Sequence, residues 1–276
     1  MRLRFTKMHG LGNDFVVIDG INQRIKLSTE RIQTLADRRF GIGCDQVLLV
    51  EPPQHPDVDF RYRIFNHDGS EVENCGNGAR CFAKFVHDRQ LTGKSTIVVE
   101  TCSGQMTLNI QANGDITVNM GVPELTPSAI PFQSEQRQTL YKLPLDEGPI
   151  DISAVSMGNP HAVTLVNDVN QAPVSTQGPA IEQHPYFPNR VNAGFMAVRS
   201  SSEIDLRVYE RGAGETLACG TGACAAVVAG RLQNLLDEQV SVNLPGGQLS
   251  IQWKGEGHPV MMTGPAETTF HGQIKL

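Results

Sequence analysis

The sequence predicts an α+β protein made of two similar halves, and three observations lead to this class. Short bursts of β-branched and aromatic residues outnumber helical patterns along the chain. The composition, with 27 Gly among 276 residues and 19% charged residues, suits strands and turns better than a helical bundle. The third observation is an internal repeat, in which Cys75-Gly76-Asn77-Gly78-Ala79 recurs about 144 residues later as Cys219-Gly220-Thr221-Gly222-Ala223.

The repeat continues on both sides of these motifs, in one order and at a nearly constant offset. The other matched segments are residues 12–14 with 158–160, residues 63–66 with 207–210, and residues 104–108 with 247–251. A period this long excludes a solenoid, whose repeats span about 20–50 residues. The repeat therefore favours a duplicated domain.

We expect the two domains to be pseudo-symmetric, with the active site in the cleft between them. The first covers residues 1–120 and is expected to be completed by residues 264–276, while the second covers residues 121–263. Five prolines and little periodicity between residues 121 and 151 predict that the linker lies there.

The individual elements follow from local patterns. The strand-like bursts lie, in chain order, at residues 60–65, 96–100, 106–110, 162–166, 204–209 and 249–253. A helix is expected over residues 28–39, where Ser28 or Thr29 can cap it. Small and apolar residues after the cysteine motifs predict two further helices, over residues 78–87 and 222–235. Each half is therefore expected to be a mostly antiparallel sheet or barrel wrapped around a central helix.

Charge and hydropathy exclude several classes of partner. The net charge of −6 and the absence of any basic run argue against a nucleic-acid surface. The apolar stretches are far shorter than the about 18 residues of a membrane span or the about 7–15 of a signal-peptide core. We therefore expect no nucleic-acid partner, no membrane contact, and a cytoplasmic location in which the six cysteines are reduced thiols.

Each cysteine motif opens a predicted helix, and this position has chemical consequences. The first N–H groups of a helix have no partner within it, and the helix dipole places positive potential there. A carboxylate can bind those donors, and the same field lowers the pKa of a cysteine. Cys75 and Cys219 are therefore predicted to flank one bound carboxylate as an acid/base pair. Such a pair can invert the adjacent stereocentre, since a thiolate takes the α-proton while a thiol on the opposite face returns one.

Two plainer interpretations of the cysteines compete with this one. A cysteine is more often a buried small hydrophobe than a catalyst, and that is the expectation for Cys44, Cys81, Cys102 and Cys224. A zinc site built from the pairs Cys75/Cys81 and Cys219/Cys224 is disfavoured by intervals of five and four residues, with no His at ligand spacing behind either pair. No metal is expected.

Longer motifs resemble one known family, diaminopimelate epimerase. The motifs are MHGLGNDFVVID near the start, GCDQ at 43–46, the NxDGS stretch from Asn66, ENCGNGARC at 73–81, GNPHAV at 158–163 and ERGAGETLACGTGACA at 210–225. The resemblance implies a cofactor-independent, two-base interconversion of LL- and meso-2,6-diaminopimelate, an isomerase step that feeds lysine and peptidoglycan synthesis. It also implies two domains of one fold and a homodimer.

The resemblance carries roles onto matching positions of this sequence. Cys75 and Cys219 match the two catalytic cysteines, and His161 and Glu210 match a pair that tunes them and contacts the reacting amino group. The backbone donors expected to hold the reacting carboxylate are those of Gly76, Asn77, Gly220 and Thr221. The side chains expected to bind the substrate are those of Asn13, Gln46, Asn66, Asn159, Asn192, Glu210 and Arg211.

Two alternative functions remain open at this point. A proline racemase would share the paired cysteines, but a cyclic monocarboxylate would give Arg211 and the asparagines no distal group to bind. A two-lobed amino-acid binding protein without chemistry would not need two thiols at equivalent helix starts. The amino acid whose α-proton the protein exchanges with solvent distinguishes the three functions: diaminopimelate for the epimerase, proline for the racemase, and none for the binding protein.

Overall fold

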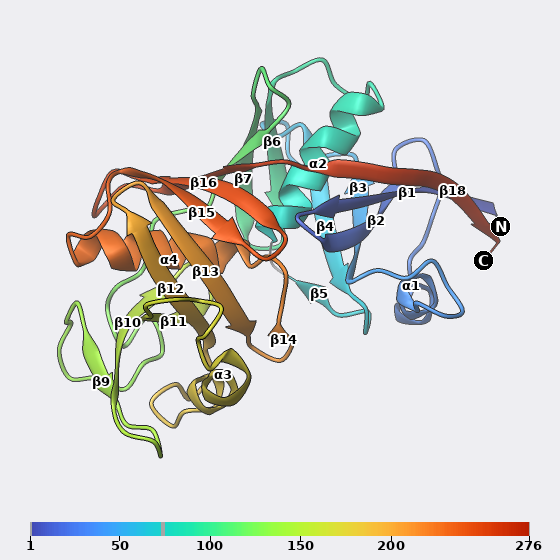
Figure 1. Cartoon of the computed structure of the whole chain (residues 1–276). Coiled ribbons are helices and arrows are strands. Elements are labelled where there is room, and N and C mark those ends of the chain that lie inside the picture. Colours follow the sequence, from blue (N-terminus) through green and yellow to red (C-terminus); the bar gives the residue numbers. More distant parts are fainter. Residues whose placement is uncertain (1, 73–74, 276) are drawn as a thin grey trace. The chain divides into compact units, whose positions relative to one another are not determined.

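A computed structural model describes residues 2–72 and 75–275 of the chain. Glu73 and Asn74, which belong to the first cysteine motif, lie outside the described residues. The chain divides into two compact units (Figure 1). The N-terminal unit comprises Met1–Asn119 and Thr263–Leu276, and the C-terminal unit comprises Met120–Met262.

The N-terminal unit is a mixed sheet with α2 packed against it. Its elements are β1 (Arg2–Gly10), β2 (Asn13–Asp19), α1 (Thr29–Ala36), β3 (Gln46–Glu51), β4 (Phe60–Asn66), β5 (Glu71–Val72), α2 (Gly76–Asp88), β6 (Thr96–Thr101), β7 (Gly104–Ile110), β8 (Ile116–Asn119) and β18 (Glu267–Lys275). Strands β1 and β2 are antiparallel, β2 and β3 parallel, β3 and β4 antiparallel, β4 and β6 parallel, and β6 and β7 antiparallel.

The two ends of the chain meet in this unit. Strand β18 pairs antiparallel with β1, and Arg2 stands opposite Lys275 (Figure 1). Gly272 permits this pairing, because a Cβ there would lie 2.4 Å from the Phe5 ring. Strand β18 thus completes the first sheet.

The C-terminal unit repeats the same arrangement. Its elements are β9 (Tyr141–Leu143), β10 (Ile150–Ser156), β11 (Pro160–Leu165), α3 (Val174–Glu182), β12 (Asn192–Ser200), β13 (Glu203–Glu210), β14 (Gly214–Glu215), α4 (Gly220–Leu232), β15 (Gln239–Leu244), β16 (Gly247–Trp253) and β17 (Val260–Gly264), whose last two residues lie beyond the unit. From β10 through β11, β12, β13 and β15 to β16, the pairs are antiparallel, parallel, antiparallel, parallel and antiparallel. This is the order seen from β1 to β7, so the sequence repeat is a repeat of topology, and the expected α+β class is confirmed.

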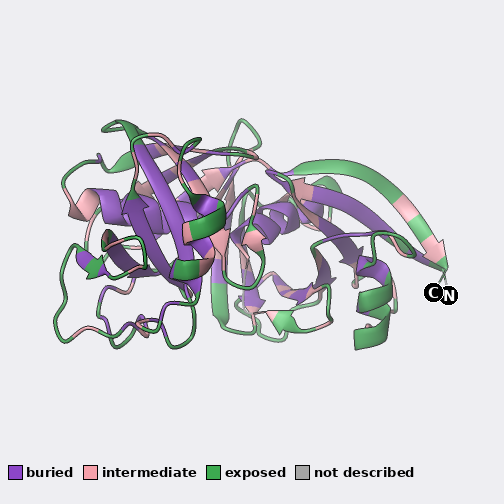
Figure 2. Cartoon of the chain, turned by 60° about the horizontal axis from the view of Figure 1, so that its bottom comes forward, coloured by how far each residue is buried: buried purple, intermediate pink, exposed green. Residues whose placement is uncertain are grey.

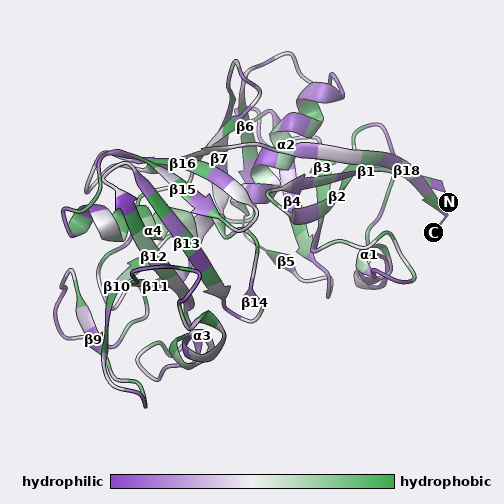
Figure 3. Cartoon of the chain, in the orientation of Figure 1, coloured by the Kyte–Doolittle hydropathy of each residue, from purple (hydrophilic) through white to green (hydrophobic). Residues whose placement is uncertain are grey.

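Helices α2 and α4 begin two residues earlier than predicted, so that each cysteine becomes the residue before the first helical turn. Cys75 is the N-cap of α2 and Cys219 is the N-cap of α4. Both helices are mostly buried (Figure 2). Helix α2 carries hydrophilic as well as hydrophobic residues (Figure 3), whereas α4 is built largely from Ala, Gly and Val, which allow close contact with the surrounding strands.

Helix α1 matches its prediction closely. The Ser28 hydroxyl accepts a hydrogen bond from the Arg31 N–H at 3.4 Å, as an N-cap residue should. Ile32, Leu35 and Ala36 form the buried face. No helix in the described part of the chain is long and apolar enough to cross a membrane.

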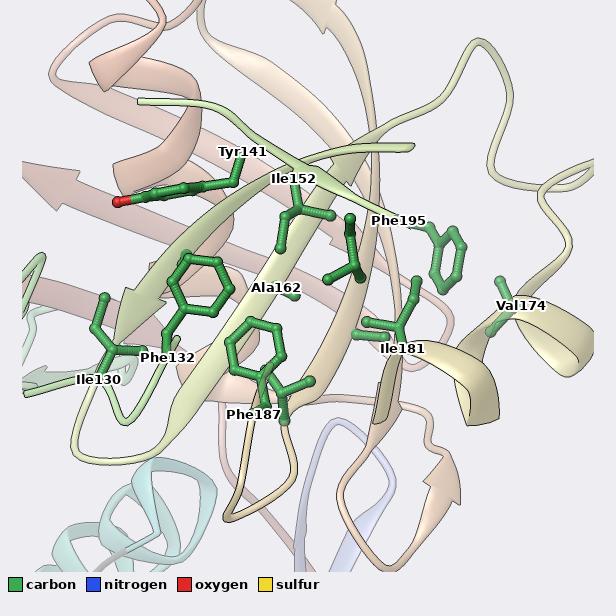
Figure 4. Close-up of a cluster of buried hydrophobic side chains, with 13 residues drawn as sticks. Ile130, Phe132, Tyr141, Ile152, Ala162, Val174, Ile181, Phe187 and Phe195 are labelled. Carbon is green, nitrogen blue, oxygen red and sulfur yellow. The ribbon is translucent and has the colours of Figure 1, made fainter. Parts of the chain in front are cut away.

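The proline-rich stretch between residues 121 and 151 is not a linker, and that prediction is wrong. Ile130, Phe132, Tyr141 and Leu143 are buried in the hydrophobic core of the C-terminal unit (Figure 4). The Phe132 ring stacks on that of Phe187 with centroids 4.7 Å apart. Irregular backbone hides the periodicity of these apolar residues, although their burial makes the segment part of the domain.

Candidate active site

The two repeated cysteines occupy equivalent positions in the two units. Both have extended backbone, with φ −147° and ψ 118° at Cys75 and φ −102° and ψ 104° at Cys219. The chain therefore turns into each helix directly after the thiol, so that the thiol stands beside the first backbone N–H groups of the helix. Those groups lack partners within the helix and favour an anion.

We define the N-terminal half-site as Asn13, Cys75 and Asn77. Asn13 links the other two residues, because its side-chain oxygen accepts a hydrogen bond from each of them. The Cys75 thiol donates to Asn13 Oδ1, with a sulfur–oxygen distance of 3.7 Å. The Asn77 amide also donates to this oxygen, at 3.3 Å. A tight turn at Leu11 and Gly12, both in the left-handed region with φ 57° and 88°, returns the chain so that Asn13 begins β2.

Gln46 and Asn66 form a second polar pair in the same unit. They stand opposite each other on β3 and β4, and Gln46 Nε2 donates to Asn66 Oδ1 at 3.0 Å. The Asn66 amide donates in turn to the Ser70 hydroxyl at 3.2 Å. The sequence-predicted residues of this unit therefore lie in two groups, one around Cys75 and one across the β3–β4 pair.

Tyr62 lies directly beneath the start of α2. Its hydroxyl donates to the Cys75 carbonyl oxygen at 3.4 Å, and its complete burial raises the pKa of the phenol well above the ordinary value. A Cβ at Gly78 would lie 2.5 Å from that hydroxyl. The second glycine of the motif is therefore needed for the helix to sit on Tyr62.

The C-terminal half-site, defined as Glu210, Cys219 and Thr221, is more enclosed. Cys219 is only 4% exposed. Its sulfur accepts a hydrogen bond from the Gly222 N–H at 3.4 Å and lies 3.6 Å from the Thr221 hydroxyl oxygen. The Thr216 hydroxyl donates to the Glu210 carboxylate.

The pKa of Cys219 moves opposite to the expectation from its helix position. Burial, and then the negative charge of Glu210, raise this pKa well above the ordinary value, while the hydrogen bonds of Thr221 and Gly222 lower it less. The predicted lowering by the helix end is therefore wrong for Cys219. The physical reason is that removing a thiolate from water beside a carboxylate costs more than the helix end returns. At neutral pH Cys219 is a thiol.

His161 and its neighbours form a further buried polar group in the C-terminal unit. His161 Nε2 lies 3.1 Å from Asn159 Oδ1. Burial, and then the positive charge of Arg211, lower the pKa of His161 to about 3, so the ring is neutral at neutral pH. A neutral ring whose Nε2 faces an amide oxygen carries its proton on Nε2.

Asn192 links that group to Arg211. His161 and Asn192 stand side by side on the parallel strands β11 and β12. The Asn192 amide donates to the Pro160 carbonyl at 2.9 Å, and its oxygen accepts the Arg211 backbone N–H at 2.9 Å. The Arg211 side chain is exposed and donates to the Asn189 carbonyl at 3.1 Å. The hydrogen bond to Asn192 fixes the Arg211 backbone, and the guanidinium has further N–H groups that can bind a ligand.

Three residues beside the half-sites carry no strong sequence signal: Arg38, Asp45 and Thr216. Asp45 stands inside the GCDQ motif next to Gln46, which is the one clue that could have found it. Among residues 2–72 and 75–275, no three His, Cys, Asp or Glu side chains come together as a possible metal-binding group.

Solved structures share this fold over nearly the whole chain. A phenazine biosynthesis protein of the PhzF family from Bacillus anthracis superposes with a TM-score of 0.70 at 15% identity, covering 100% of both chains. A hydroxyproline epimerase from Agrobacterium vitis gives a TM-score of 0.70 at 14% identity, covering 99% of this chain and 92% of its own. A probable proline racemase from Agrobacterium radiobacter gives 0.69 at 17% identity, with 99% and 93% covered.

Relatives of high sequence identity, rather than the fold, define the class of the protein: it is an isomerase of the racemase and epimerase class. A family model described as diaminopimelate epimerase matches residues 5–126 and 153–269. Diaminopimelate epimerases from Teredinibacter turnerae and Nitrosospira multiformis are 65% and 59% identical over 276 residues, covering 100% of this chain and 100% and 99% of theirs. The chain belongs to the diaminopimelate epimerase family.

Proposed function

We propose that this protein interconverts LL- and meso-2,6-diaminopimelate by a two-base mechanism in which Cys75 and Cys219 exchange protons with the α-carbon. The observation that carries the proposal is the pair of cysteines at equivalent helix starts, one in each unit. The substrate follows from family membership, because the relatives at 59–65% identity are named for it.

The two thiols have different environments, which suits opposite roles. In one direction Cys75, as the thiolate, takes the α-proton, and Cys219 gives its proton to the opposite face of the carbon. Burial and Glu210 support the donor role, since they keep the Cys219 proton in place at neutral pH. After one inversion Cys75 is the thiol and Cys219 the thiolate. The reverse direction then begins from this second state.

Backbone donors supply the electrostatic stabilisation. As the α-proton leaves, negative charge spreads into the neighbouring carboxylate, and pre-oriented N–H groups stabilise that charge. The N–H groups of Gly76, Asn77, Gly220 and Thr221 lie in the first turns of α2 and α4. We assign them to the reacting carboxylate. No step of this scheme needs a cofactor or a metal ion.

The polar side chains around the two half-sites suit a substrate with two ammonium groups and two carboxylates. Asn13, Gln46, Asn66 and Asn159 provide amide oxygens and N–H groups. Arg211 can take the distal carboxylate with two parallel N–H donors. Asn192 retains one amide hydrogen for the substrate after its two bonds to Pro160 and Arg211.

His161 and Glu210 complete the assignment. Neutral His161 orients the Asn159 amide, and the Glu210 carboxylate, charged beside Cys219, attracts the reacting ammonium group. We also propose that the protein works in the cytoplasm as a homodimer. Its product then enters lysine and peptidoglycan synthesis.

The test is proton NMR of the reduced protein with LL-diaminopimelate in D₂O, with EDTA present and no pyridoxal phosphate. The expected result is loss of the α-proton signal together with the appearance of the meso isomer. Exchange with proline but not with diaminopimelate would contradict the substrate and favour a proline racemase. Binding of diaminopimelate with no exchange would contradict the enzyme activity itself.

A further inference from the structure

Asp45 lies behind the N-terminal half-site, in contact with Asn13. The Asn13 amide nitrogen donates to Asp45 Oδ2 at 2.9 Å, while the amide oxygen of the same side chain accepts from Cys75 and Asn77. Asp45 precedes β3, and Asn13 begins β2, the strand that runs parallel to β3. One carboxylate is therefore joined to the thiol through a single amide.

The chemistry of the pair fixes the orientation of the amide. A carboxylate can only accept hydrogen bonds, so it selects the nitrogen end of Asn13. The oxygen end must then face Cys75. Rotation of the amide by half a turn would place two oxygens against each other at Asp45 and an N–H group against the sulfur.

Asp45 is itself held by charged and backbone donors. Arg38 Nη2 contacts Asp45 Oδ1 at 2.7 Å, and the Asp14 N–H donates to Asp45 Oδ2 at 3.1 Å. The Asp45 N–H donates to Asp14 Oδ1 at 2.8 Å. The donors to the carboxylate come from two segments, the start of β2 and Arg38 after α1, so the Asp45 carboxylate is held in one orientation.

Asp14 holds both Asp45 and Arg38 in place. Arg38 approaches its two oxygens at 2.8 and 3.0 Å, and Lys7 Nζ lies 2.6 Å away. Although burial raises it, these hydrogen bonds hold the pKa of the Asp14 carboxyl well below its usual range. The anchor therefore stays charged at neutral pH.

We propose that Asp45 is a positioning residue for the reaction: it holds the Asn13 amide so that its carbonyl oxygen, and not its N–H₂ group, faces the Cys75 sulfur. A carbonyl facing the sulfur stabilises the thiol that forms when Cys75 takes the α-proton. A base whose protonated form is stabilised in this way is the stronger base. The inference rests on the proposed role of Cys75.

The equivalent asparagine of the C-terminal unit is oriented differently. Asn159, the counterpart of Asn13 in the repeat, has its amide oxygen beside His161 Nε2. Cys219 instead has the Gly222 N–H and Thr221 hydroxyl as neighbours. The Asp45–Asn13–Cys75 link thus belongs to the N-terminal unit, and it gives Cys75 a setting of its own.

Several other titratable and charged groups lie around Cys75 and Asn13. Tyr62 on β4 donates to the Cys75 carbonyl, and Arg80 on α2 donates to the Gly76 carbonyl at 3.4 Å. Arg38, Asp14 and Lys7 form the charged group behind Asn13. Asp45→Ala therefore removes one nearby charge, the partner of the Asn13 amide nitrogen, and the contacts to Arg38 and the Asp14 N–H.

The experiment compares Asp45→Ala with Asp45→Asn, and both with Asp151→Ala. Asp151 is the matched control, since its side chain is 49% exposed against 44% for Asp45 and it pairs with Lys142 at 2.8 Å. The readouts are kcat for the epimerisation and the pH midpoint of Cys75 alkylation by iodoacetamide, followed by mass spectrometry of the Cys75 peptide. The alkylation readout needs no turnover.

Asp45→Ala is expected to lower kcat about 10–100-fold. It is also expected to lower the alkylation midpoint by about half to one pH unit, because the released amide can turn its N–H₂ group to the thiolate. Asp45→Asn removes the same charge, but its oxygen is expected to stay toward the two donors Asn13 and the Asp14 N–H. It should therefore restore most of the activity and of the midpoint.

Three outcomes would overturn the proposal. The first is a loss of activity in Asp45→Ala with an unchanged midpoint, which would mean a merely structural role. The second is an equal midpoint shift in both Asp45 variants, which would assign the effect to charge. The third is an Asp45→Ala variant whose kcat and alkylation midpoint equal those of Asp151→Ala. A wild type that exchanges no α-proton would instead contradict the proposed function, while the alkylation comparison would still decide this point.

Discussion

The Cys219 sulfur accepts the Gly222 N–H at 3.4 Å, and this contact opposes the effect of Glu210 on the same thiol. Burial and Glu210 favour the protonated sulfur, whereas the Gly222 N–H stabilises the thiolate. Cys219 therefore carries its proton at rest, and in the proposed mechanism the Gly222 N–H stabilises the thiolate that forms once this proton is given to the substrate.

Glu210→Gln is expected to lower the pKa of Cys219. The carboxylate raises this pKa through its negative charge, so a neutral amide removes the repulsion and makes the thiolate more accessible. The pH midpoint of Cys219 alkylation, followed by peptide mass spectrometry, should move to lower pH. Glu215→Gln is the matched control, because Glu215 lies on the same hairpin but bonds Arg207 at 2.6 Å. An equal midpoint in both variants would show that Glu210 does not act on the thiol.

Cys75→Ala and Cys219→Ala are each expected to reduce the epimerisation rate by about 10²–10⁴-fold or more, the contribution of a general acid or base. Cys81→Ala and Cys224→Ala are the controls, since each changes a buried cysteine further along the same helix. The rates are measured with purified protein whose circular dichroism matches the wild type. Activity above about a tenth of wild type in Cys75→Ala or Cys219→Ala would rule out these two cysteines as the acid and base of the reaction.

Gly78→Ala is expected to destabilise the N-terminal unit by about 1–3 kcal/mol, because the new Cβ would lie 2.5 Å from the Tyr62 hydroxyl. The free energy of unfolding in urea measures the effect. Gly93→Ala is the control, since no atom lies within 4 Å of a Cβ placed there. Adding Tyr62→Phe removes the hydroxyl oxygen and should recover part of the loss. If Tyr62→Phe recovers none of the lost stability, the Tyr62 hydroxyl is not the source of the clash.

His161 makes stability sensitive to acid. Its pKa is lowered to about 3 in the folded protein, from an ordinary value of about 6.5, so the fold favours the neutral ring. The stabilisation is complete above the unfolded pKa and is lost as the pH falls from about 6.5 toward 3. Within that range the wild type should lose ~1.4 kcal/mol more per pH unit than His161→Gln, which has no such proton to bind. Parallel unfolding curves for the two proteins would contradict a neutral, buried His161.

Much of the fold could be predicted because the two domains share recognisable sequence motifs at a nearly constant offset. Gly78 and Gly222, each three residues after its cysteine, lie where a helix begins against packed side chains: a Cβ there would lie 2.5 Å from the Tyr62 hydroxyl and 3.0 Å from the Val208 side chain. Their equal spacing from the cysteines marks equivalent points of two domains. Helix α3 carries no such signal, since Gly178 and Pro179 interrupt its pattern. Gly178 is nevertheless needed there, because a Cβ would lie 2.7 Å from the Tyr209 ring.

The site could be predicted by residue type but not by environment. A helix start suggests a lowered thiol pKa, yet the depth at which Cys219 lies and the approach of Glu210 depend on tertiary packing. The sequence motif GCDQ contains Asp45 but does not indicate its role, for the same reason. Its importance comes from one hydrogen bond to a residue 32 positions away.

The most direct test of the two-base account is the early distribution of deuterium in D₂O, starting from LL-diaminopimelate. Mass spectrometry of the two separated isomers during the first few per cent of reaction gives their deuterium content. Two cysteines on opposite faces predict that the meso product carries deuterium at the inverted carbon, while the recovered LL substrate still carries hydrogen. Deuterium entering the recovered substrate as fast as the product would mean that a single base serves both faces, and would contradict the account.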